Sequence, residues 1–173
     1  MRAKGETRPA APALYTLDER RRRDASPWTR VQAVLAPLQF LVFLVSLALV
    51  VRYLATGEGY LLATVSIVLK TFVLYLIMIT GSIWEHEVFG RWLFAPSFFW
   101  EDVVSMLVLA LHTAYLLVLF TDLLTPSEQM LLALGAYAVY LVNAGQFVLK
   151  LRRARLESGA VADGASLWAE AAR

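Results

Sequence analysis

The chain contains four apolar runs of about 20 residues each, which is the length that an α-helix needs to cross a lipid bilayer. They cover residues 28–54, 60–82, 101–121 and 127–149. Apolar residues make up 59% of the 173 residues and charged residues only 17%, whereas soluble domains carry about 25% charged residues. Because lipid offers no partner for backbone polar groups, each run is predicted to form a helix. The expected fold class is an all-α integral membrane protein, a bundle of four transmembrane helices.

Local signals mark where these helices begin. Ser26-Pro27 places an N-cap residue and a first-turn proline ahead of the first run. Thr125-Pro126-Ser127-Glu128 does the same ahead of the fourth. We therefore expect an N-terminal tail over 1–25, a membrane domain over 26–155 and a disordered tail over 156–173. The connection between the second and third helices spans residues 83–100.

Basic residues predict the orientation. Arg20 to Arg23 precede the first run and Lys150 to Arg155 follow the fourth, whereas the two short turns are mainly acidic. The positive-inside rule then places both termini and the 83–100 connection in the cytoplasm. The first 25 residues lack the apolar core of a signal peptide, so we expect the first span to direct insertion. The basic clusters adjoin membrane helices, which favours contact with anionic lipid over nucleic acid.

The 83–100 connection combines large aromatic side chains with charged ones. One interpretation is an aromatic belt that anchors an amphipathic turn at the lipid surface. The other is an aromatic-walled pocket with carboxyl groups at its rim, where apolar surroundings would keep such groups protonated and useful as acids. The aromatic residues are Trp84, Phe89, Trp92, Phe94, Phe98, Phe99 and Trp100, and the charged or polar ones are Glu85, His86, Glu87 and Arg91, followed by Glu101 and Asp102.

Helical spacing places the acids of the third helix on different faces. Glu101, Ser105, Val108 and His112 follow one stripe, on which Glu101 and His112 lie roughly 16 Å apart. That separation suits the two ends of a large flat ligand. Asp102 points about 100° away from Glu101, so we expect it to meet the second helix or the connection.

Ionisable and amide groups inside the spans are further candidates. Lys70 needs a partner, a watery cavity or deprotonation in the middle of its helix. His112 is either a hydrogen-bonded packing residue, a ligand to a metal in a substrate, or a proton carrier. A polar arc on the fourth helix provides either interhelical hydrogen bonds or a pocket wall; it consists of Tyr140, Asn143, Gln146 and Lys150. The chain has no cysteine, which excludes disulfides, thiolate metal sites and a cysteine nucleophile.

Several stretches of the sequence together resemble one enzyme family over nearly the whole chain. The central ones are Gly81-Ser82-Ile83-Trp84-Glu85, Val88-Phe89-Gly90-Arg91-Trp92-Leu93-Phe94-Ala95-Pro96, Phe98-Phe99-Trp100-Glu101-Asp102-Val103 and Leu109-Ala110-Leu111-His112-Thr113-Ala114-Tyr115, and the others are 14–23, Ser26-Pro27-Trp28 and 53–60. With them the chain closely resembles the vinyl bacteriochlorophyllide hydratases.

The resemblance implies a hydro-lyase of bacteriochlorophyll biosynthesis in a bacterial inner membrane. Such enzymes hydrate the C3 vinyl group of a magnesium chlorin or bacteriochlorin to a 1-hydroxyethyl group. No cofactor is expected, because the substrate carries the magnesium. The expected partners are this magnesium tetrapyrrole, membrane lipid and other enzymes of the pathway, and a homo-oligomer is left open.

Alkene hydration assigns roles to the candidate residues. An acid protonates the terminal carbon and a base then helps water to add, so we expect Glu85 and Glu101 as the acid/base pair and Asp102 as the next candidate. The substrate-binding set is expected to stack on the ring, ligate its magnesium or line the site; it comprises Trp84, Phe99, Trp100, His112, Lys70, Asn143 and Gln146.

Two other functions are compatible with the sequence. The first is a non-catalytic membrane protein that binds a tetrapyrrole for assembly or transport. The second is an ion-coupled transporter subunit that uses Lys70 and His112 as a relay, although four helices without internal repeats argue against it.

Overall fold

The described part of the chain consists of five helices. The computed structural model describes the backbone of residues 14–121 and 123–171 and the side chains up to Leu156. Its helices are α1 (Leu17–Ala25), α2 (Pro27–Thr56), α3 (Tyr60–Phe89), α4 (Phe99–Thr121) and α5 (Pro126–Ala171). Four of them are long and apolar enough to cross a membrane, with Pro126–Leu156 as the apolar part of α5. The predicted all-helical class with four candidate spans is therefore confirmed.

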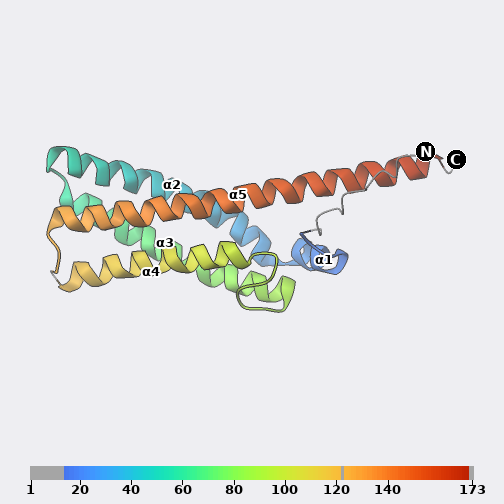
Figure 1. Ribbon diagram of the computed structural model, residues 1–173, viewed down its shortest axis with the longest axis horizontal. Coiled ribbons are helices and arrows are strands. Elements are labelled where there is room, and N and C mark those ends of the chain that lie inside the picture. The colour runs from blue at the N-terminus through green and yellow to red at the C-terminus, as the bar shows by residue number, and fades with distance from the viewer. Residues whose placement is uncertain (1–13, 122, 172–173) are drawn as a thin grey trace, which may run out of the picture.

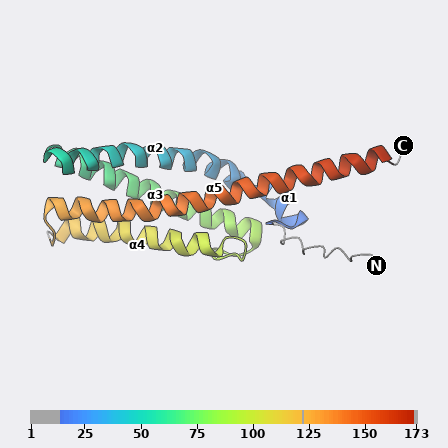
Figure 2. The same cartoon turned by 45° about the horizontal axis from the view of Figure 1, so that its top comes forward.

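Helices α2 to α5 run side by side in an elongated bundle (Figures 1 and 2). Helix α1, the segment between α3 and α4, and the C-terminal part of α5 lie at one end, which we call the loop end. The turns from α2 to α3 and from α4 to α5 lie at the other, which we call the turn end. Four antiparallel spans bring these segments together, because an even number of crossings returns the chain to the side where it started.

The predicted start signals operate in the structure. Ser26 caps α2, where its Oγ accepts a hydrogen bond from the Trp28 N–H at 3.2 Å. Thr125 and Glu128 exchange cap hydrogen bonds at the start of α5, including Thr125 N–H to Glu128 Oε2 at 2.8 Å. Gly57 ends α2 with a left-handed φ of 75°, a conformation that glycine adopts without steric cost.

Two helices are longer than the sequence indicated. Helix α3 continues past residue 82 to Phe89, so Glu85 lies on a helix rather than in a loop. The stretch contains no helix breaker before Gly90, whose left-handed φ of 74° caps the helix. Helix α5 runs to Ala171, whereas we expected a disordered tail over 156–173. That segment is rich in alanine, which has the highest helix propensity.

Polar side chains link the helices inside the apolar core. Ser46 Oγ on α2 lies 2.6 Å from Tyr137 Oη on α5 and 2.7 Å from Ser66 Oγ on α3. Closer to the loop end, Gln32 Nε2 donates to Thr80 Oγ1 at 2.8 Å and so joins α2 to α3. Lipid provides no hydrophobic drive between helices, so such bonds and close packing hold the bundle together.

Gln39 is one of the buried polar side chains in the described region that lack such a partner. It is 2% exposed, and neither its amide nitrogen nor its amide oxygen has a hydrogen-bond partner among the described residues. A buried amide without a partner costs about 1–3 kcal/mol.

Replacing each of the two glutamines of α2, Gln32 and Gln39, by leucine should therefore have opposite effects on stability. Gln39→Leu is expected to raise the thermal unfolding midpoint in detergent, because it removes an unpaired buried amide. Gln32→Leu is the matched control and should lower the midpoint, since it loses a bond worth about 0.6 kcal/mol in a membrane protein. A midpoint for Gln39→Leu that falls as far as that of Gln32→Leu would contradict this account.

Candidate functional site

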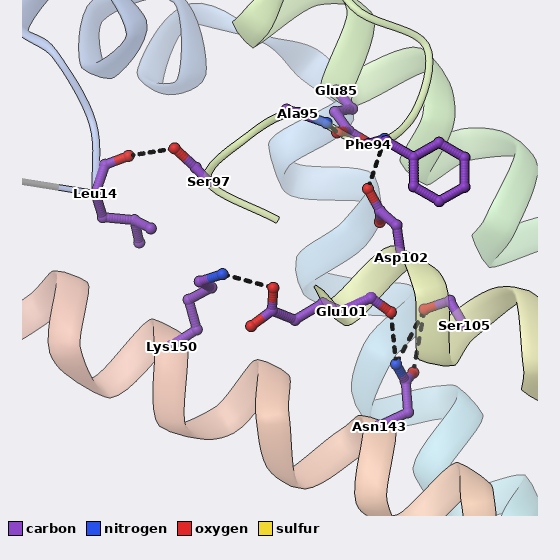
Figure 3. Close-up of polar contacts among 10 residues, drawn as sticks. All are labelled: Leu14, Glu85, Phe94, Ala95, Ser97, Glu101, Asp102, Ser105, Asn143 and Lys150. Carbon is purple, nitrogen blue, oxygen red and sulfur yellow. Dashed lines mark hydrogen bonds and ion pairs between the residues drawn. The ribbon is translucent and has the colours of Figure 1, made fainter. Parts of the chain in front are cut away.

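Two acidic side chains meet at the loop end of the bundle. Glu85 lies on the last turns of α3 and Asp102 on the first turn of α4. They are 3% and 7% exposed, and their carboxyl groups lie close enough to interact. Asp102 thus faces the second span and the following loop, as the helical spacing predicted (Figure 3). We call these two residues the carboxyl pair.

The loop of residues 90–98 covers the carboxyl pair with its backbone. The Phe94 N–H donates to Asp102 Oδ2 at 2.8 Å, and the next N–H, of Ala95, donates to Glu85 Oε1 at 2.5 Å (Figure 3). Phe94 adopts a φ of 60°, in the left-handed region that costs a residue with a Cβ about 1–2 kcal/mol. The two carboxyl groups therefore hold the loop in a strained conformation, and the loop fixes their direction in return.

The arrangement favours one proton on the carboxyl pair. Two carboxylates in contact repel each other, and burial removes the water that would screen them. A proton held between them removes the repulsion and lets one carboxyl group donate a hydrogen bond to the other. Aspartic proteases, whose two carboxyl groups lie in contact, share one proton in this way.

Glu101 belongs to a neighbouring network. Its Oε2 accepts from Lys150 Nζ at 2.5 Å, and its backbone oxygen accepts from Asn143 Nδ2 at 3.0 Å (Figure 3). Asn143 also bonds Ser105 on α4, with Nδ2 3.0 Å from Ser105 Oγ. The Lys150 ammonium group holds this carboxyl group in an ion pair, which suits an electrostatic role better than that of a proton donor. The structure thus brings Glu85 to Asp102 rather than to Glu101.

The three aromatic candidates fall into two groups. Trp84 points into the protein, where its Nε1 donates to Thr29 Oγ1 at 2.9 Å and its ring meets Phe98 edge-on at 5.6 Å. Phe99 and Trp100 are 43% and 69% exposed. Of the three, only the rings of Phe99 and Trp100 are open to stacking by a flat ligand. Trp84 instead packs against the loop residue Phe98.

Leu14 and Tyr15, which precede α1, also contact the loop and the end of α3. Tyr15 is buried and stacks on Phe89 at 5.8 Å, and burial raises the pKa of its hydroxyl, which stays protonated. Ser97 Oγ donates to the Leu14 carbonyl oxygen at 3.0 Å (Figure 3). The sequence predicted a tail over residues 1–25 and not this contact, for which the Tyr15 ring was the available signal.

Lys70 and His112 form a second buried pair deeper in the bundle. Lys70 Nζ lies 2.8 Å from His112 Nε2, and His112 Nδ1 lies 2.8 Å from the Val108 oxygen. Both residues are 0% exposed. Lys70 is separated from Glu85 by about 22 Å along α3, so the two pairs are distinct sites. Because both ring nitrogens are engaged, His112 has no free nitrogen for a metal ion in this arrangement.

Gln146 is the last of the predicted substrate-binding residues. It lies on α5 between Asn143 and Lys150, and its Oε1 is buried without a hydrogen-bond partner among the described residues. It joins neither the carboxyl pair nor the Glu101 network through any hydrogen bond in the described region.

The strained loop makes a prediction about Phe94. Phe94→Gly and Phe94→Ala both remove the ring, but only glycine adopts the left-handed conformation freely. Phe94→Gly should therefore be more stable than Phe94→Ala by about 1 kcal/mol, measured as the difference between their thermal midpoints. Equal midpoints for the two variants would show that the backbone at this position carries no strain.

Comparison with known proteins identifies the family. A family model described as 2-vinyl bacteriochlorophyllide hydratase (BCHF) matches residues 15–153. A protein of that name from Rhodobacter capsulatus is 65% identical over 150 residues, which cover 87% of this chain and 87% of the relative. Another, from Cereibacter sphaeroides, is 64% identical over 153 residues, which cover 87% of this chain and 95% of the relative. No solved structure matches the chain. With this identity along both sequences, and with the match spanning all four apolar helices, the chain belongs to the 2-vinyl bacteriochlorophyllide hydratase family.

Proposed function

We propose that this protein adds water across the vinyl group of a bacteriochlorophyllide and forms a 1-hydroxyethyl group, with the carboxyl pair as its acid and base. Membership of the family and the names of both relatives support the reaction. The observation that carries the mechanism is the contact between the buried carboxyl groups of Glu85 and Asp102.

The first step is protonation of the alkene. The shared proton moves to the terminal vinyl carbon, and the π electrons form the new C–H bond. The positive charge on the adjacent carbon is delocalised into the macrocycle. Transfer of a proton by a positioned side chain contributes about 10²–10⁴-fold to a rate.

The second step is addition of water to the cation. A water oxygen bonds to the cationic carbon and releases one proton, which returns to the carboxyl pair. The vinyl group and one water molecule become a 1-hydroxyethyl group, and the pair regains its starting state. The reaction needs no oxidant or reductant.

The loop backbone stabilises the charges that develop between these steps. After proton transfer the pair carries two negative charges, opposite a cation in the substrate. The N–H groups of Phe94 and Ala95 already donate to these carboxyl oxygens, and preorganised donors of this kind stabilise charge without reorganisation. The Glu101–Lys150 ion pair adds a fixed charge distribution beside the site.

The remaining candidates have different roles in this proposal. Phe99 and Trp100 stack on the macrocycle near the carboxyl pair, because their rings are exposed there. Asn143 orders the first turn of α4 through its bonds to Glu101 and Ser105. We assign Lys70 and His112 to the interior of the bundle and not to the substrate.

The loop end is proposed to face the cytoplasm. Exposed basic side chains gather at this end on α1 and α5, where a cytoplasmic surface would favour them. They are Arg21, Arg22, Arg152, Arg153 and Arg155.

The reaction is tested directly with purified protein, a vinyl-bearing bacteriochlorophyllide and water enriched in ¹⁸O. The product should be heavier than the substrate by one water molecule and contain the label, as measured by mass spectrometry. A sample without protein is the control. Pigment that binds but stays unchanged would contradict the hydratase and support a carrier.

The mechanism predicts a ranking among acidic variants. Glu85→Gln and Asp102→Asn should each lower kcat by about 100-fold or more, while pigment still binds. Glu101→Gln should lower kcat by less, because Glu101 transfers no proton in this mechanism. Glu58→Gln, an exposed position at the turn end, should behave as the unmodified protein. Normal turnover in both Glu85→Gln and Asp102→Asn would show that the carboxyl pair is not the acid.

A further inference from the structure

A groove of about 310 Å³ lies between α3 and α4. It is lined by Tyr75, Met78 and Ile79 of α3 and by Leu109 and Thr113 of α4. Ile79 is 61% exposed, so the groove opens at the side of the bundle. Its volume is at the lower end of the roughly 300–1,000 Å³ of small-molecule sites. It is therefore suited to one edge of a tetrapyrrole and not to the whole ring.

The groove lies on the same helical faces as the carboxyl pair. On α3, Met78, Ser82 and Glu85 are spaced i, i+4 and i+7, which places them on one stripe. On α4, Asp102 and Leu109 are also seven residues apart. The groove and the carboxyl pair are thus about 10 Å apart along the line of contact between α3 and α4, which we call the seam. This distance is similar to the width of a ring of four pyrroles.

Two hydroxyl groups cross this otherwise apolar groove. Tyr75 Oη lies 2.8 Å from Thr113 Oγ1, which in turn donates to the Leu109 carbonyl oxygen at 2.8 Å. Tyr75 is therefore the donor to Thr113, and its O–H can turn to another acceptor. A lipid acyl chain has no atom that could accept this bond, whereas an oxygen substituent on a macrocycle does.

We propose that this groove holds the edge of the substrate macrocycle remote from its vinyl group, with the Tyr75 hydroxyl donating to an oxygen on that edge. The ring then lies along the α3/α4 seam, and its vinyl group reaches Glu85 and Asp102 at the loop end. This subsite rests on the proposed function for the identity of its ligand. It also gives the substrate a route from the lipid, since the groove opens at the side of the bundle.

The first test fills the groove. Leu109→Trp places a large ring in it, and Leu107→Trp is the matched control because Leu107 is 50% exposed and does not line the groove. Both changes are made in the Glu85→Gln variant, and the Kd of bacteriochlorophyllide is measured by absorption titration without turnover. Leu109→Trp should weaken binding about tenfold, and Leu107→Trp should leave it unchanged. An unchanged Kd for Leu109→Trp would overturn the proposal and leave the groove to lipid chains.

The second test uses a change that preserves shape. Tyr75→Phe in the otherwise unmodified protein should raise KM by about 3–10-fold, the equivalent of one neutral hydrogen bond, with kcat nearly unchanged. Unaltered KM and kcat would overturn the assignment of Tyr75. The hydration reaction and the groove subsite can be refuted independently of each other. Unmodified protein that does not hydrate the pigment, with Leu109→Trp still weakening binding, refutes the reaction and supports the subsite.

Discussion

The contact between Glu85 and Asp102 is the interaction on which the loop end of this protein depends. Asp102 accepts a hydrogen bond from the Phe94 N–H and Glu85 accepts one from the next N–H of the covering loop, that of Ala95. These two bonds hold Phe94 in a left-handed conformation. The side chains of Tyr15 and Trp84 then pack against the aromatic residues behind it. The same contact that shapes the loop also favours a proton between two acids that water would otherwise ionise.

Polar contacts in the core of the bundle connect its helices, together with their close packing. The Lys70–His112 pair lies near the middle of the spans, where Lys70 Nζ also lies 4.2 Å from the centre of the Tyr140 ring. Ser46 connects α2, α3 and α5 on the same core. Since apolar packing alone distinguishes poorly between helix registers in lipid, these directional bonds explain how α3 and α4 are aligned. That alignment in turn brings Glu85 to Asp102.

The sequence was sufficient for the features that depend on local chemistry. The length of the apolar runs predicted the spans, the caps at Ser26 and Thr125 predicted where helices begin, and helical geometry predicted the direction of Asp102. It was insufficient where two segments must be placed against each other. The number of residues between Glu85 and Asp102 does not show that their side chains meet. Whether they meet depends on how α3 is rotated about its own axis relative to α4. Helix α3 was also predicted too short, since aromatic residues suggested a loop although nothing before Gly90 stops a helix.

The central claim is that the carboxyl pair carries one proton at neutral pH, and infrared spectroscopy tests it most directly. A protonated carboxyl group has a C=O stretching band apart from the bands of carboxylates, and the band shifts when H₂O is replaced by D₂O. We predict such a band in the unmodified protein, altered in both Glu85→Gln and Asp102→Asn and retained in Glu58→Gln. A spectrum with no protonated carboxyl band at neutral pH, or with one that neither substitution alters, would contradict the account.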